Sequence, residues 1–147
     1  MIRGGRLPFY PQFLLTAIIQ TGKTVLCSTI IENVESWCCP ETRCVYFYFD
    51  FSDPAKKNVV NMLYSFLAQL SIQEIHADVR RLYEACGRGN LGATVTQLTN
   101  TLITIARERK TTYVLVDALD ESSDREALSD IITTIHQSGQ FNLLLTS

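Results

Sequence analysis

The chain has 147 residues, of which 46% are hydrophobic and 19% are charged, so it can bury the core of one globular domain. Its net charge of −2 argues against a nucleic acid or an anionic membrane as a partner. No apolar stretch has the length of a membrane-spanning helix. The five cysteines are odd in number and lack metal-binding spacing, which indicates reduced thiols in a cytoplasmic protein.

The chain divides into a short tail and one domain. Residues 1–12 are rich in Gly, Arg and Pro and are predicted to form a disordered tail. Residues 13–147 are predicted to form the domain. Its last apolar run has no helix after it, so we expect the domain to be part of a longer one.

Short apolar runs alternate with amphipathic segments along this domain. The runs are continuous, which is typical of strands buried on both faces of a parallel sheet, and they cover residues 13–19, 44–51, 112–117 and 141–146. The segments between them carry apolar residues every three to four positions, which predicts helices around residues 24–37, 59–70, 75–86, 94–109 and 123–138. This alternation predicts an α/β fold, a three-layer sandwich with a mostly parallel sheet.

Three local signals mark helix ends. Thr94 with Gln97, and Ser123 with Glu126, have the spacing of capping boxes at helix N-termini. Gly139 is predicted to follow the end of the last helix.

The two histidines, His76 and His136, lie on predicted helices and are expected at the surface without a chemical role.

The apolar run 112–116 leads directly into an acidic cluster, Asp117, Asp120 and Glu121. An aspartate at the end of a buried parallel strand lies at the carboxyl edge of the sheet, where α/β proteins bind ligands. In a P-loop NTPase, this position (the Walker B element) holds Mg²⁺. Asp120 or Glu121 could then orient or deprotonate an attacking water. The alternative is a solvated acidic turn that caps the next helix.

A matching phosphate-binding element lies upstream, at Gly22, Lys23, Thr24 and Val25. A lysine for the β- and γ-phosphates and a hydroxyl for the metal, both opening a helix, are what a nucleoside triphosphate with Mg²⁺ requires. We therefore expect these four residues to bind nucleotide, with Thr24 and Asp117 as metal ligands. The alternative is that neither residue binds nucleotide: Lys23 would be an ordinary lysine at the start of a helix, and Thr24 a threonine packed against its neighbours.

This element departs from the complete loop pattern G-x-x-x-x-G-K-[ST]. Ala17 stands where the first glycine belongs, and the interior is Ile-Ile-Gln-Thr. Isoleucine disfavours the positive φ angles of a phosphate-binding loop and places bulk where the backbone must approach oxygen.

Three stretches in this order resemble the NACHT domains of STAND-type P-loop NTPases, which are abundant in fungal NOD-like proteins: GKTVLCS at 22–28, YFYF at 46–49 and LVDALDE at 115–121. The chain looks most like the nephrocystin-like N-terminal NACHT group, whose members often carry ankyrin or WD40 repeats downstream. The resemblance covers residues 22–147 and implies that Lys23 and Thr24 hold phosphate and Mg²⁺. It also implies protein partners bound through downstream repeats.

The resemblance also sets expectations about what is missing. The sensor arginine of the family would follow Ser147, and a helical lid would complete the nucleotide site, so we expect a NACHT domain truncated at both ends. The predicted function is a regulatory switch that binds ATP or GTP and hydrolyses it slowly. The alternatives are a nucleotide-free remnant acting as an interaction module and a P-loop phosphotransferase or ATPase.

Overall fold

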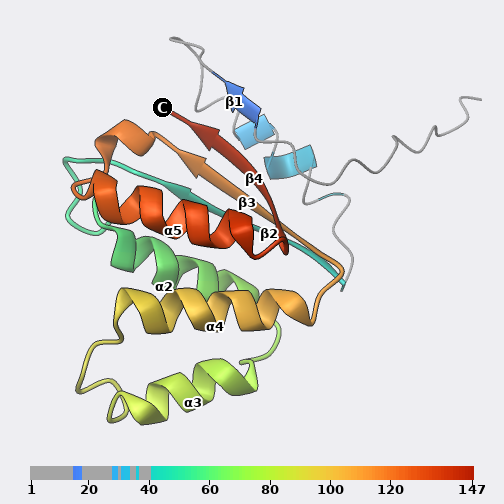
Figure 1. Ribbon diagram of the computed structural model, residues 1–147, viewed down its shortest axis with the longest axis vertical. Helices are drawn as coiled ribbons and strands as arrows, with labels where there is room; N and C mark the ends of the chain where they lie inside the picture. Colours follow the sequence, from blue (N-terminus) through green and yellow to red (C-terminus); the bar gives the residue numbers. More distant parts are fainter. Residues whose placement is uncertain (1–14, 18–27, 30, 34–35, 37–40) are drawn as a thin grey trace, which may run out of the picture.

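A parallel sheet with a layer of helices on one face forms the domain in the computed structural model (Figure 1). The structure describes residues 15–17, 28–29, 31–33, 36 and 41–147. The predicted tail, residues 1–12, lies outside the described residues, as do Gly22, Lys23, Thr24 and Val25.

Four parallel strands make up the described sheet. They are β1 (Leu15–Ala17), β2 (Thr42–Tyr48), β3 (Thr111–Asp117) and β4 (Phe141–Thr146), in the spatial order β1-β4-β3-β2. The predicted α/β class is therefore confirmed. The order places β4 between β1 and β3, so the last strand of the chain separates the two strands that carry the predicted nucleotide motifs.

Burial alternates along the strands more than their continuous apolar sequence predicts. One face of the sheet is fully buried and contributes eight residues to the hydrophobic core: Val45, Phe47, Phe49, Val114, Val116, Phe141, Leu143 and Leu145. On the other face, several side chains such as Tyr46, Tyr113 and Leu144 are only half-buried. Burial on both faces holds at the carboxyl end of β3, where Leu115, Val116 and Asp117 are all buried.

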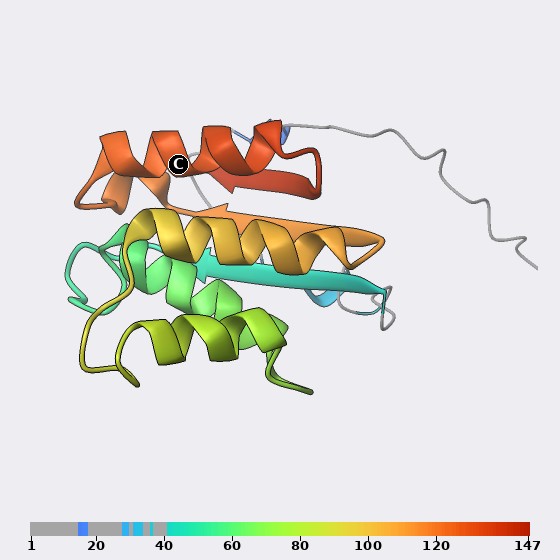
Figure 2. The ribbon, with the colours of Figure 1, turned by 60° about the horizontal axis from the view of Figure 1, so that its bottom comes forward.

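The buried face packs against three helices, α2 (Val59–Leu70), α4 (Val95–Arg107) and α5 (Arg125–Gln137), whose inward residues join the same core (Figures 1 and 2). Residues 28–29, 31–33 and 36 are also helical. They belong to the connection from β1 to β2, which crosses the sheet in the opposite direction to the connections from β2 to β3 and from β3 to β4. Because such crossovers are right-handed, the described helical residues of this connection belong to the opposite face of the sheet, in agreement with the predicted three-layer sandwich.

Helix α3 (Ala77–Ala85) lies outside this arrangement and packs beside α4 (Figure 2). It has no buried residue of its own. Its start is held by His76, whose Nδ1 accepts a hydrogen bond from the Asp78 N–H at 3.2 Å and whose Nε2 lies 2.7 Å from Glu108 Oε2. The expectation that His76 lies at the surface is corrected: the residue is half-buried, and it has a structural role, because it caps one helix and ties it to the end of another.

The helix caps bear out one prediction and correct another. At α4 the capping box is complete, since Gln97 N–H donates to Thr94 Oγ1 at 3.2 Å and Thr94 N–H donates to Gln97 Oε1 at 2.9 Å. At α5 the capping residue is Asp124, which accepts from Ala127 N–H at 3.0 Å, and not Ser123. Ser123 instead donates its N–H and its hydroxyl to the Lys57 carbonyl, at 2.7 and 2.8 Å. Gly139 follows α5 with φ +70°, as predicted.

Candidate functional site at the carboxyl edge of the sheet

Asp117 is the last residue of β3, and it is a carboxylate placed inside the protein. Asp117 is only 5% exposed. An aspartate is rarely buried in this way unless other groups in the protein interact with its carboxylate. The Phe49 N–H donates to its backbone carbonyl at 3.0 Å and so continues the pairing of β2 with β3 beyond Tyr48. The sequence-based expectation that Asp117 lies at the carboxyl edge of the sheet is confirmed.

Two donors hold the Asp117 side chain. The Ala118 N–H donates to Asp117 Oδ1 at 2.9 Å, and the Thr146 hydroxyl donates to the same oxygen. Thr146 comes from the end of β4 and is 3% exposed. Sequence reasoning missed Thr146 as a site residue. The available signal was a polar residue at the end of a run that is otherwise strongly apolar.

The chain leaves β3 through a strained turn. Ala118 adopts φ +56° and ψ +48°, a left-handed conformation that costs a non-glycine residue about 1–2 kcal/mol. A single 3-10 turn, Leu119–Glu121, follows. The left-handed residue redirects the chain from β3 into this turn, directly after the Ala118 N–H that donates to Asp117 Oδ1. Strain of this kind concentrates at functional sites.

The other two predicted acids, Asp120 and Glu121, lie on this turn in different environments. Asp120 is exposed, and its backbone carbonyl accepts from an Arg125 guanidinium nitrogen at 2.7 Å. Glu121 is half-buried, and its Oε2 accepts from the Phe51 N–H at 3.3 Å, which ties the turn to the loop after β2. A carboxylate already held by a backbone donor is the better oriented of the two, so Glu121 is the stronger candidate for positioning a water.

A further acid, Asp50, lies just past the end of β2 at this same edge. The Ser52 hydroxyl and the Ser52 N–H both donate to Asp50 Oδ1, at 2.5 and 2.9 Å, and these bonds lower the pKa of the Asp50 carboxyl. The sequence-based prediction treated Asp50 as part of the strand. In the structure β2 ends at Tyr48, so Asp50 becomes an ionised loop residue.

Strand register brings β1 to the same level of the sheet. Ala17, the last residue of β1, pairs with Thr146, and the pair before Asp117 and Thr146 is Val116 with Leu145. Three strand ends therefore stand side by side, from β1, β4 and β3. The segment that carries Gly22, Lys23 and Thr24 leaves the sheet from the first of them, although these residues themselves lie outside the described part of the chain.

The described residues fit a Mg²⁺ ion in the chemistry of their donors. Magnesium binds oxygen ligands and is commonly held in proteins by one or two carboxylates together with substrate phosphates. The edge offers the buried Asp117 carboxylate, the Thr146 hydroxyl and the carboxylates of Asp120 and Glu121. Thiol and imidazole groups, which would favour zinc, are not among these donors.

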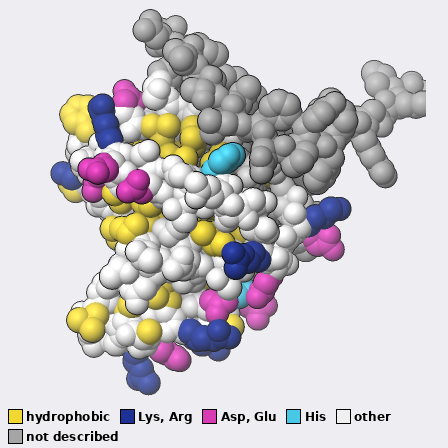
Figure 3. Space-filling view, viewed as in Figure 1, with side chains coloured by type: hydrophobic (Ala, Val, Ile, Leu, Met, Phe, Trp, Pro, Cys, Tyr) yellow, Lys and Arg dark blue, Asp and Glu magenta, His cyan; other side chains and the backbone are white. Residues whose placement is uncertain are grey.

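The surface around the turn between β3 and α5 carries acidic and basic side chains interspersed (Figure 3, upper left).

The described part of the chain has no helix whose length and apolar character would let it cross a membrane. Its buried thiol, Cys86, forms no disulfide.

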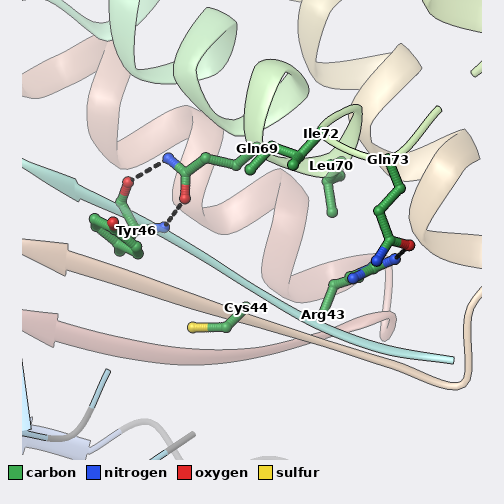
Figure 4. Close-up of a pocket in the computed structure, with 7 residues that line it drawn as sticks. All are labelled: Arg43, Cys44, Tyr46, Gln69, Leu70, Ile72 and Gln73. Carbon is green, nitrogen blue, oxygen red and sulfur yellow. Dashed lines mark hydrogen bonds between the residues drawn. The ribbon is translucent and has the colours of Figure 1, made fainter. Parts of the chain in front are cut away.

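A cavity of about 290 Å³ lies elsewhere, beside β2 and the end of α2 (Figure 4). Arg43, Cys44 and Tyr46 line it from the strand, and Gln69 and Gln73 line it from the helical side. The Gln69 side-chain amide accepts from Tyr46 N–H at 3.0 Å and donates to Tyr46 O at 2.8 Å, in the way a neighbouring strand would. The cavity is therefore a gap along the sheet margin, separate from the carboxyl edge.

Fold and site together define an α/β domain with a parallel sheet and an acidic cluster at its carboxyl edge. The sequence model of one family, described as Nephrocystin 3, N-terminal, matches residues 10–147. The chain belongs to this family, as its resemblance to the nephrocystin-like group predicts. Comparison with curated proteins and with solved structures found no match.

Proposed function

We propose that this nephrocystin 3 N-terminal domain is a nucleotide-binding switch module of the NACHT type, which binds ATP or GTP with Mg²⁺. One observation carries the proposal: the register of the sheet places the end of β1, Thr146 and Asp117 at one edge. The motif Gly22-Lys23-Thr24 follows the end of β1 in the sequence, Asp117 ends β3, and β4 is the strand between β1 and β3.

The residues take distinct roles in this proposal. Lys23 and the N–H groups of Gly22 and Val25 bind phosphate, and Thr24 with Asp117 holds the metal. When bound, Mg²⁺ neutralises charge on the phosphates. Glu121, or Asp120 next to it, orients a water for slow hydrolysis.

The switch follows from differential binding. A nucleotide that binds one conformation of the module more tightly shifts the population toward that conformation, and hydrolysis reverses the shift. In a STAND-type protein, this change is passed to partner proteins through downstream repeats in the cytoplasm. The acidic site and the family membership support this proposal, while Ile18 and Ile19 are the residues that most disfavour tight phosphate binding.

Thermal unfolding with Mg²⁺-ATP and with Mg²⁺-GTP tests the proposal, because a ligand that binds only the native state raises its apparent stability. At a ligand concentration 100-fold above Kd, we expect the melting temperature to rise by roughly 5–10 °C. Lys23→Ala should abolish the rise. Lys110→Ala should not, because Lys110 is an exposed lysine that precedes β3, at the opposite edge of the sheet.

Each other outcome selects an alternative. A cooperative transition that neither nucleotide shifts would indicate an interaction module without nucleotide. Rapid multiple turnover with transfer to a small acceptor would indicate a phosphotransferase. If hydrolysis is slow as proposed, single-turnover rates for Glu121→Gln and Asp120→Asn separate the two acids, and we expect the larger loss for Glu121→Gln.

A further inference from the structure

Thr146 occupies a distinctive place in the sheet. It ends β4, the strand that lies between β1 and β3, and it stands at the level where β1 ends and where Asp117 begins the acidic turn. Its hydroxyl is the group from β4 that reaches the Asp117 carboxylate. Thr146 is therefore the residue of β4 that lies between the end of β1 and Asp117.

The hydrogen bond from Thr146 to Asp117 is of the kind that holds a metal-binding carboxylate in a fixed orientation. Asp117 Oδ1 accepts from both Ala118 N–H and Thr146 Oγ1, so the carboxylate is fixed from its own strand end and from the neighbouring strand. Asp117 and Thr146 are both nearly fully buried, so water competes little for the bond between them. Carboxylates that bind metals are oriented by hydrogen bonds of this kind.

We infer that Thr146 is a positioning residue for Asp117, whose hydroxyl orients the carboxylate for Mg²⁺ in the magnesium–nucleotide complex. This inference rests on the proposed function. It assigns to β4 a direct part in metal affinity and not merely in folding. Loss of the hydroxyl should therefore weaken the metal dependence of nucleotide binding more than it weakens the fold.

Two substitutions separate the hydroxyl from the shape of the side chain. Thr146→Val keeps the branched shape and removes the hydroxyl, and Thr146→Ser keeps the hydroxyl. The matched control is Thr112→Val. Thr112 is a fully buried threonine near the start of β3, and its hydroxyl has no hydrogen-bond partner among the described residues.

The experiment measures the melting temperature of the full chain at fixed ATP against Mg²⁺ concentration, together with the melting temperature without nucleotide. For Thr146→Val we expect the Mg²⁺ concentration at half-maximal stabilisation to rise by about 10–100-fold, the range seen when supports of metal ligands are removed. Thr146→Ser should stay within about threefold of the parent chain, since it keeps the donor. Thr112→Val should leave the magnesium midpoint unchanged.

The outcomes distinguish this inference from the proposed function. If the parent chain responds to Mg²⁺-ATP and Thr146→Val shows the same magnesium midpoint, Thr146 is only a structural residue and the inference is overturned, while the proposed function stands. A lower melting temperature without nucleotide, together with an unchanged midpoint, would overturn the inference in the same way. If the parent chain does not respond, the proposed function fails and the inference fails with it.

Discussion

The helical layer and the carboxyl edge of the sheet are built on opposite principles. In the helical layer, α2 and α4 each bury six residues, nearly all of them apolar, and α4 begins with a complete capping box. At the carboxyl edge, a carboxylate is buried and the next residue has a left-handed backbone. The first region stabilises the native state mainly by burying apolar side chains, whereas the second retains backbone strain and a buried carboxylate. Such local conflicts are expected where a site is maintained at some cost in stability.

Truncation in the helical layer should have the largest effect on stability. Phe66 is fully buried between α2 and the rest of the core, and Phe66→Ala is expected to lower the free energy of unfolding by about 3–5 kcal/mol. The control is Tyr83→Ala on α3, where the side chain is 55% exposed and the loss should stay below about 1 kcal/mol. Urea denaturation measures both variants, and equal losses would contradict the distinction between α3 and the core helices.

Removal of the α4 cap should cost less. Thr94→Ala leaves the Gln97 N–H without its acceptor, and we expect a loss of about 1 kcal/mol in the free energy of unfolding. The exposed Thr96 lies inside the same helix, so Thr96→Ala serves as the control and should change stability by less than about 0.5 kcal/mol. A neutral Thr94→Ala would show that packing alone sets the start of α4.

Relief of strain at the carboxyl edge should act in the opposite direction. In Ala118→Gly, removal of a left-handed penalty of about 1–2 kcal/mol exceeds the added chain entropy of about 0.5–1 kcal/mol. We therefore expect a gain of about 0.5–1 kcal/mol in the free energy of unfolding. The Mg²⁺-ATP shift should become smaller, because glycine loosens the support of Asp117.

Arg88 provides the matched control, because it also has φ +56° but lies in an exposed loop away from the edge. Arg88→Gly should raise the melting temperature by a similar amount and leave the nucleotide response unchanged. If both variants changed the response equally, the strain at Ala118 would have no special connection with the site.

The smallest effect is expected at the contact between α3 and α4, and it depends on pH. The hydrogen bond and charge of His76 lower the pKa of the Glu108 carboxyl, so this contact stabilises the fold above the ordinary glutamate pKa of about 4.3. Its contribution is lost as the pH falls through the lowered pKa. The melting temperature of Glu108→Gln should therefore lie slightly below that of the parent chain at pH 6 and converge with it once the pH has fallen below the lowered pKa of the Glu108 carboxyl.

An exposed glutamate of α3 gives the comparison for this last variant. Glu84→Gln should show no such convergence, because the residue lies on the outer surface of the helix. A pH-independent difference for Glu108→Gln would mean that the contact acts through packing and not through charge.

Much of the helical layer could be predicted from the sequence, because its signals are local. The three- to four-residue spacing of apolar side chains located α2 and α4, and the pair Thr94 and Gln97 located one helix start to the residue. The start of α5 was placed one residue early, since Ser123 and Asp124 are both good capping residues. Which of the two caps the helix depends on Lys57, a residue distant in the chain, whose carbonyl accepts hydrogen bonds from Ser123.

The candidate site divides in the same way. Asp117, Asp120 and Glu121 could be found from an acidic cluster after an apolar run, and their position at the edge of the sheet is confirmed. The roles of Lys23 and Thr24 stay predictions. Asp50 and Thr146 were not identified as site residues. Each is a polar residue at or near the end of an apolar run, but this local signal does not encode the contact between the Thr146 hydroxyl and Asp117.

By itself, the sequence determined the alternation of strands and helices, the class of fold and the acidic character of one strand end. These features depend on neighbours within a few positions, where backbone geometry and hydrophobic periodicity act directly. Only the tertiary structure decided that β4 lies between β1 and β3 and that the hydroxyl of Thr146 meets Asp117. Strand order is set by packing and pairing between segments far apart in the chain, so no pattern among near neighbours in the sequence encodes it.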